Sequence, residues 1–161
     1  MRETSMVFSP FSAVRAEDFL PLLNDETLRK HLIPHPLFDV AGVRDWMAYK
    51  LGVDARPGCR VRAIFLDGTL AGWCGIQPDD EGVELAIVLA RAGWGSGVAI
   101  FNEMMGWARE LGHRTILFHL LDTRPPYLSL ARRAIWVRKT RLGEHPFTTY
   151  CLDVERWSAG P

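Results

Sequence analysis

The glycine-rich segment Gly93-Trp94-Gly95-Ser96-Gly97 is the part of the sequence best suited to binding a ligand. It follows a predicted strand and precedes a predicted helix. Glycines let backbone N–H groups approach a ligand, and the first turn of a helix offers unpaired N–H donors at its positive end. The segment therefore predicts a cradle for an anion such as a diphosphate, although the same spacing also fits a tight turn that binds nothing.

Two nucleotide-binding motifs are excluded for this segment. A dinucleotide-binding fingerprint needs a third glycine, but Ile100 stands at that position. A Walker loop needs a lysine followed by serine or threonine, and no such pair follows Gly97. The predicted cradle therefore depends on backbone donors.

Glu84 is the second candidate for chemistry, because it is the one carboxylate on the otherwise apolar predicted strand 83–89. A buried charge without a partner costs free energy, so its presence calls for an explanation. It suits a general base that acts directly or through water, and it suits equally a glutamate that is exposed at an edge or paired with a cation. His119, on the next predicted strand, could face the same cleft, but a lone strand histidine is more often a satisfied core residue.

The cysteines and histidines do not predict a metal site. The three cysteines are odd in number and lack CxxC spacing, which also argues against a disulfide framework. His31 and His35 are close in sequence, but Pro34 between them prevents them from sharing one helical face. We expect no bound metal, and core packing or lining of an acceptor site for this histidine pair.

The first half of the chain predicts a short strand, three helices and an antiparallel meander. Asp39 suits the N-cap of the third helix, and Gly52 suits its end. Asp67-Gly68 between two apolar runs is the strongest short-range signal of a β-hairpin. The predicted ranges are a strand from residue 6, helices at 15–23, 25–31 and 39–51, and strands at 60–66, 69–76 and 83–89.

The second half predicts a crossover helix and a closing hairpin. The helix at 98–111 has its apolar residues at helical spacing, and the strand at 115–121 is most simply parallel to the strand before that helix. A short helix at 125–134, with proline in its first turn, and strands at 136–142 and 147–154 follow. Together these elements predict an α+β fold with a mixed, mostly antiparallel central sheet flanked by helices.

Length and composition fit one globular domain over residues 1–161. Hydrophobic residues make up 48% of the chain and charged residues 24%, which argues against disorder. Nineteen Lys and Arg balance nineteen Asp and Glu, so the chain lacks the basic surplus typical of nucleic-acid binders. We find no apolar run long enough to span a bilayer and no signal peptide, and we expect a cytoplasmic protein without membrane partners.

The turn Trp94-Gly95-Ser96-Gly97 belongs to a set of segments that occur in a recognisable order. The others are Phe19–Asp25, Leu70–Gly75, Val83–Ile87 and Tyr150–Trp157. In this order they resemble the GNAT superfamily of acyl-CoA-dependent N-acyltransferases, in which a Q/R-x-x-G-x-G/A turn wraps the pyrophosphate of acetyl-CoA. The W-G-x-G form is similar to the branch of the ribosomal-protein-alanine N-terminal acetyltransferases, and the resemblance covers nearly the whole chain.

The resemblance implies acetyl-CoA as co-substrate, with direct attack by an acceptor amine on the thioester. It implies contacts to the pantetheine arm and carbonyl from the backbone near the end of strand 83–89, and contacts to the pyrophosphate from the turn. The cofactor-binding residues implied in this way are Val88, Leu89, Gly93, Trp94, Gly95, Ser96, Gly97 and Val98. For catalysis we predict Glu84 as the base. Tyr127, at the position of a serine that is often functional in this branch, is the predicted acid, unless it only packs against the cofactor or core.

The sequence departs from the family pattern at three places. Ala92 stands where the turn usually has Gln or Arg, although Arg91 is adjacent. Ala131 stands where many members use a tyrosine to protonate the departing thiolate. In a later motif, Arg124, Ile135 and Trp136 replace Asn, Gly and Phe.

We therefore expect an N-acetyltransferase that moves an acetyl group from acetyl-CoA to an amine, either a protein N-terminus or a small molecule. The alternatives are a non-catalytic GNAT-fold protein that binds acyl-CoA, favoured by Ala92 and Ala131, and a partner-binding domain, which the intact glycines disfavour. The acceptor would be selected by the loop at 31–36 and the closing hairpin, whose charge patterns name no substrate. Because GNAT proteins are often dimers, the resemblance leaves a homodimer open.

Overall fold

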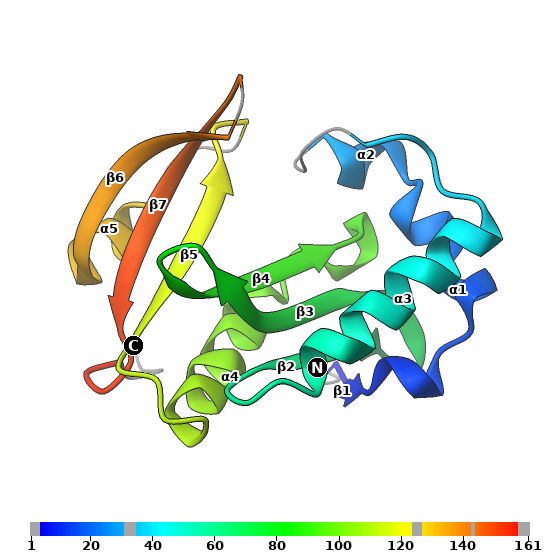
Figure 1. The fold of residues 1–161 in the computed structure, drawn as a ribbon, viewed down its shortest axis with the longest axis horizontal. Coiled ribbons are helices and arrows are strands. Elements are labelled where there is room, and N and C mark those ends of the chain that lie inside the picture. The colour runs from blue at the N-terminus through cyan, green and yellow to red at the C-terminus, as the bar shows by residue number, and fades with distance from the viewer. Residues whose placement is uncertain (1–3, 31–34, 124–126, 143, 158–161) are drawn as a thin grey trace.

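One mixed sheet organises the computed structural model, which describes residues 4–30, 35–123, 127–142 and 144–157. The strands of these residues lie in the order β1-β2-β3-β4-β5-β7-β6 (Figure 1). Their bounds are β1 Met6–Ser9, β2 Arg60–Leu66, β3 Thr69–Asp79, β4 Gly82–Leu89, β5 Thr115–Leu121, β6 Ala134–Leu142 and β7 His145–Asp153. Neighbouring strands are antiparallel except β4 and β5, which are parallel. The predicted mixed, mostly antiparallel sheet is confirmed.

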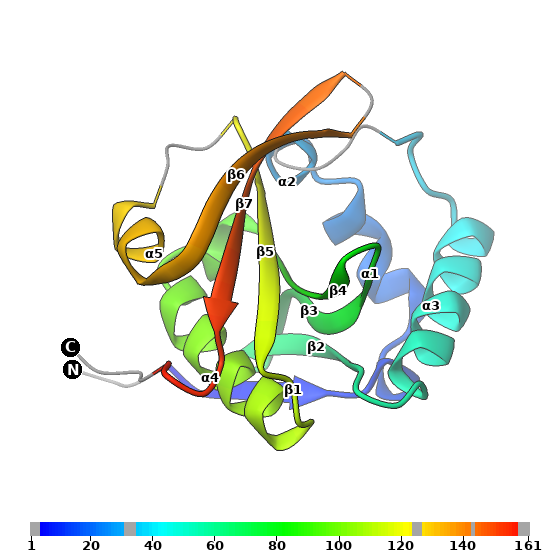
Figure 2. The ribbon, with the colours of Figure 1, turned by 60° about the vertical axis from the view of Figure 1, so that its left-hand side comes forward.

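Helices cover the two faces of this sheet, and each face has its own apolar core (Figure 2). The helical segments are η1 Phe11–Ala13, α1 Ala16–Leu23, α2 Glu26–Arg29, α3 Val40–Asp54, η2 Arg91–Gly93, α4 Gly97–Glu110 and α5 Leu128–Arg133. Leu85 of β4 packs in the core with α4, whereas Val88 of the same strand packs in the core with α1 and α3. Both faces of β4 are therefore covered, as its nearly continuous apolar sequence requires.

Several predicted bounds need correction. Helix α3 continues through Gly52 to Asp54. A Cβ added at Gly52 would have no atom within 4 Å, and glycine costs a helix only about 1 kcal/mol relative to alanine, too little to end it. The Asp39 cap is confirmed, since its carboxylate accepts a hydrogen bond from the Gly42 N–H at 2.7 Å.

Strand β3 is longer than predicted, because it continues through Pro78 to Asp79. The β3–β4 ladder runs on to the pair Asp79–Gly82, which leaves a short hairpin turn instead of the looser turn predicted from residue 78. Proline is tolerated next to the turn, where a missing N–H interrupts little of the ladder. This extension brings the side chains of Gln77 and Asp79 onto the sheet.

The last elements are also displaced from their predicted bounds. Helix α5 begins at Leu128, and β6 follows it directly from Ala134. The predicted helix start at 125 lies outside the described residues, as does the end of the predicted helix 25–31. Of that second helix the structure has α2, whose N-cap Asp25 accepts a hydrogen bond from the Leu28 N–H at 2.9 Å.

Strands β4 and β5 diverge, and this opening shapes the site. Among the described residues they form one ladder pair, Glu84 with Leu117, and Figure 1 shows their C-terminal ends pointing apart. On its other edge, β4 lies so close to β3 that a Cβ on Gly72 would be 2.0 Å from the Val88 carbonyl oxygen. Glycine at position 72 thus permits the close approach that fixes the end of β4.

The three cysteines, Cys59, Cys74 and Cys151, are free and buried. Burial raises the pKa of each thiol, so the thiols stay protonated at neutral pH. None of the described helices has the length and apolar character needed to cross a membrane.

Candidate active site

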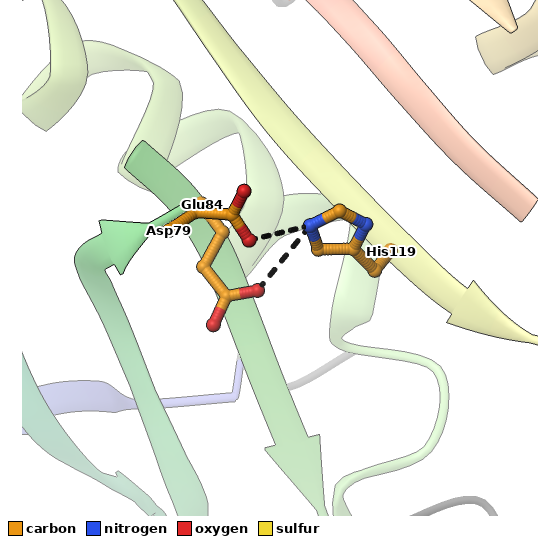
Figure 3. A group of neighbouring side chains, drawn as sticks. All are labelled: Asp79, Glu84 and His119. Carbon is orange, nitrogen blue, oxygen red and sulfur yellow. Dashed lines mark hydrogen bonds and ion pairs between the residues drawn. The ribbon is translucent and has the colours of Figure 1, made fainter. Parts of the chain in front are cut away.

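Glu84 and His119 face each other where β4 and β5 meet (Figure 3). His119 Nε2 lies 3.7 Å from Glu84 Oε2 and 2.9 Å from Oδ2 of Asp79. The three side chains are between 20% and 23% exposed, so a small group can reach them from solvent. Glu84 is therefore neither fully buried nor exposed at an edge.

Strand alternation explains why these side chains point to the same side. Val83 and Leu85 pack in the α4 core, so Glu84 between them points to the opposite face. Phe118 is likewise buried in the α4 core, which turns His119 toward the face that carries Glu84. Both ring nitrogens of His119 have hydrogen-bond partners, so this histidine is satisfied, but it is half-buried beside Glu84 and does not lie in the apolar core.

Each member of the pair is held by further polar side chains. Gln77 Nε2 donates to Glu84 Oε1 at 2.7 Å, and Lys50 Nζ donates to Gln77 Oε1 at 2.6 Å. On the other side, His119 Nδ1 lies 2.7 Å from the hydroxyl of Thr149. The structure thus forms a polar chain from α3 through β3, β4 and β5 to β7.

Sequence reasoning missed Lys50, Gln77, Asp79 and Thr149 as members of this chain. For Lys50 a signal exists, because it falls on the buried face of α3 with Val43 and Met47. The other three had none, since a polar residue near a strand end is ordinary.

The ligand-type atoms of Asp79, Glu84 and His119 all lie within 4.8 Å of one another, close enough to converge on a small cation. The imidazole already bonds to one carboxylate and approaches the other, and the ammonium of Lys50 lies nearby. The arrangement therefore already contains groups of the chain that contact these carboxylates. It can hold and pass a proton, because a carboxylate and an imidazole are both suited to acid–base work.

The glycine-rich turn leaves an uncapped helix end. Ser96 is the N-cap of α4, and no side chain caps this helix. Its first backbone hydrogen bond runs from the Ile100 N–H to the Ser96 carbonyl, so the N–H groups of the first turn remain available to a ligand. Gly95 has φ of +101°, a conformation that favours glycine. The turn therefore fits a bound anion.

The predicted cofactor residues lie together at one end of β4. Leu89 contacts both sides of the turn, since a Cβ on Gly93 would lie 3.1 Å from Leu89 Cδ2 and one on Gly97 would lie 4.0 Å from Leu89 Cδ1. The side chains of Trp94 and Val98 are 48% and 75% exposed. The side chain of Val88 is buried, which leaves its backbone as the part available to a ligand. Along β4, Glu84 is five residues from Leu89, which corresponds to roughly 17 Å in an extended strand.

Tyr127 is not brought to Glu84 by any contact of the described residues. It caps the N-terminus of α5, its side chain is 44% exposed, and its backbone N–H lies 3.3 Å from the hydroxyl of buried Tyr150. The preceding Arg124 lies outside the described residues, as do His31 and Pro34 of the predicted acceptor loop.

Comparison with family models matches residues 6–124 to a model described as an acetyltransferase (GNAT) domain. Comparison with curated proteins finds no match.

Solved structures share the fold at low sequence identity. A protein assigned to the GNAT family from Chromobacterium violaceum has a TM-score of 0.69 at 15% identity, covering 98% of this chain and 91% of that chain. A Salmonella typhimurium protein assigned as an acetyltransferase, solved with its cofactor acetyl-CoA, has a TM-score of 0.69 at 13% identity, covering 98% and 97%. An acetyltransferase from the same organism that modifies the N-terminal serine of ribosomal protein L7/L12 has a TM-score of 0.66 at 17% identity, covering 95% and 96%.

Proposed function

Because this chain belongs to the GNAT acetyltransferase family, we propose that it transfers an acetyl group from acetyl-CoA to an amine. One observation carries the proposal: β4 runs from a half-buried glutamate beside His119 to a turn that opens on an uncapped helix N-terminus. A single strand thus links a candidate base with a candidate diphosphate cradle. All the described strands belong to one sheet, which fits one acetyltransferase domain.

The backbone supplies the proposed contacts to acetyl-CoA. The N–H groups at the start of α4 and in the turn would hold the pyrophosphate, where the helix dipole favours negative charge. Because the described residues of β4 and β5 pair only at Glu84 and Leu117, the backbone of Val88 and Leu89 has no ladder partner on the β5 side, and we propose that the cofactor binds along this edge. An extended pantetheine arm laid along it would bring the thioester toward Glu84.

In the proposed mechanism Glu84 accepts a proton from the acceptor ammonium, either directly or through water. The freed amine nitrogen then forms a bond to the thioester carbonyl carbon, and the carbon–sulfur bond breaks as the thiolate leaves. The nitrogen releases its second proton to water, which gives the neutral amide. His119 and Asp79, which adjoin Glu84, provide a route by which the accepted proton can reach solvent. Tyr127 is the proposed donor of the proton that the thiolate takes up.

The acceptor we favour is a protein N-terminus, with a small-molecule amine as the other candidate. The likeness of the fold to the structure that modifies an N-terminal serine supports the first choice. The carboxylates of Asp79 and Glu84 fit an amine that arrives positively charged, which both classes provide.

Acetyl-CoA is expected to bind to the purified protein at about one molecule per chain with micromolar or tighter affinity. The helix N-terminus and the free edge of β4 provide the donors for it. Calorimetric titration with acetyl-CoA, with free CoA for comparison, measures this directly. No detectable binding would overturn the proposal. Binding without turnover on peptides with free N-termini or on simple amines would instead identify a non-catalytic acyl-CoA-binding protein.

Replacement of Tyr127 by phenylalanine is expected to lower kcat about tenfold and leave KM for acetyl-CoA unchanged. The effect is modest for a general acid because a thiolate is a stable leaving group compared with an alkoxide or amide. Ser129→Ala, which removes another exposed hydroxyl of the same helix, is the matched control. An unchanged kcat in Tyr127→Phe would remove Tyr127 as the acid.

A further inference from the structure

A lysine lies buried in α3 behind the site. Lys50 is 8% exposed and shares the buried face of the helix with Val43, Met47 and Val53. An ammonium group in such a position is costly unless polar or charged partners surround it. The contacts of Lys50 should therefore explain why a lysine is buried at this position.

Those contacts lead to Glu84. Lys50 Nζ lies 2.6 Å from Gln77 Oε1 and 4.5 Å from the centre of the Trp73 ring, and Gln77 Nε2 lies 2.7 Å from Glu84 Oε1. An ammonium group only donates hydrogen bonds, and a carboxylate only accepts them. The amide of Gln77, between the two, can therefore satisfy both neighbours in a single orientation.

We propose that Lys50 and Gln77 are positioning residues for the reaction, holding the Glu84 carboxylate by Oε1 so that Oε2 faces His119. This inference rests on the proposed function, in which Glu84 is the base. Neither residue touches the reacting atoms in this scheme. Both act through the orientation and charge of the glutamate.

The charges around Glu84 support this role. Burial lowers the pKa of Lys50, and the Glu84 carboxylate opposes that shift because it favours the charged ammonium. The other ionisable groups that face Glu84 are Asp79 on β3 and His119 on β5. Removal of the lysine charge therefore changes the electrostatic surroundings of the Glu84 carboxylate.

The first test compares pH profiles of matched variants. Lys50→Met removes the charge and keeps an unbranched side chain over Trp73, and Lys50→Arg keeps the charge. We expect Lys50→Met to lower kcat/KM about tenfold at neutral pH and to move the acid side of the profile to higher pH. Lys50→Arg should restore most of the activity, and KM for acetyl-CoA should not change.

The control is Arg44→Met, which removes a charge from the same helix at an exposed ion pair with Glu17. It should behave as the wild-type protein does. A loss of rate in Lys50→Met that is equal at every pH, with a lowered melting temperature, would show structural support alone and overturn the positioning role. Gln77→Leu, which breaks the chain without removing a charge, should repeat the loss of rate.

The second test does not depend on activity. The titration of the Lys50 ammonium, followed by NMR of isotope-labelled lysine, is expected to move to lower pH in Glu84→Gln, because the opposing carboxylate is gone. An unchanged titration would overturn the coupling. Absence of turnover in the wild-type protein would remove the proposed function. Turnover with a Lys50→Met profile like that of the wild type would remove only the positioning role.

Discussion

Glu84→Gln is expected to lower kcat for acetyl transfer about 100-fold to 1,000-fold, the range for loss of a well-placed general base. Glutamine has nearly the same size and can still meet Gln77, but it cannot accept the proton of the acceptor amine. The affinity for acetyl-CoA should stay nearly unchanged, because Glu84 lies at the opposite end of β4 from the turn. The loss should therefore appear in kcat and not in cofactor binding.

Steady-state rates and calorimetric titration of the same samples separate these two quantities. Glu103→Gln, a change of the same type at an exposed position of α4, is the control and should match the wild type. A rate in Glu84→Gln equal to that of the wild type would remove Glu84 as the base. His119 would then be the next residue to replace, since its imidazole is a proton-accepting group beside Glu84.

Gly97→Trp should weaken acetyl-CoA binding 100-fold or more, which is roughly 2.7 kcal/mol or above. Gly97 is the first residue of α4, so an indole at this position would occupy the space in front of the helix N-terminus. The substitution should not strain the fold, because a Cβ there meets only Leu89 Cδ1 at 4.0 Å and φ is not positive. Lost binding would thus report on the site and not on unfolding.

Gly106→Trp is the matched control for this experiment. Gly106 lies on the exposed side of the same helix, with no atom within 4 Å of an added Cβ. It should bind acetyl-CoA as the wild type does, and thermal melting of both variants verifies that they fold. Normal binding by Gly97→Trp would contradict the assignment of the turn to the pyrophosphate.

Short-range sequence signals correctly predicted several turns and helix caps, which depend on interactions between residues close together in the chain. Asp67 and Gly68 have φ of +49° and +81°, the left-handed pair that a two-residue hairpin turn requires and that Asp-Gly provides. The turn at 93–97 and the cap at Asp39 were predicted for similar reasons. Where a signal was weak, as at Gly52, or was outweighed by ladder hydrogen bonds, as at Pro78, the bound was wrong.

The composition of the site depended on long-range geometry. His119 meets Glu84 because the parallel ladder aligns Glu84 with Leu117, and no local pattern encodes that register. Lys50 meets Gln77 across 27 residues of sequence, and Gln77 is on the sheet only because β3 is longer than its turn signals suggested. Glu84 was predictable as an anomaly on its strand, whereas its partners were not.

The single ladder pair between β4 and β5 has a mechanical consequence. It divides the described sheet into a four-stranded ladder, β1 to β4, and a three-stranded ladder, β5, β7 and β6. The two ladders are also joined by apolar packing against α4, in a core that includes Met104, Leu85 and Ile116, and by the side-chain contacts of His119 with Asp79 and Glu84. Because only one ladder pair of the described residues crosses this boundary, it should deform more easily than the fully paired parts of the sheet. A ligand that hydrogen-bonds along the unpaired edge of β4 would then make the boundary between the two ladders more rigid.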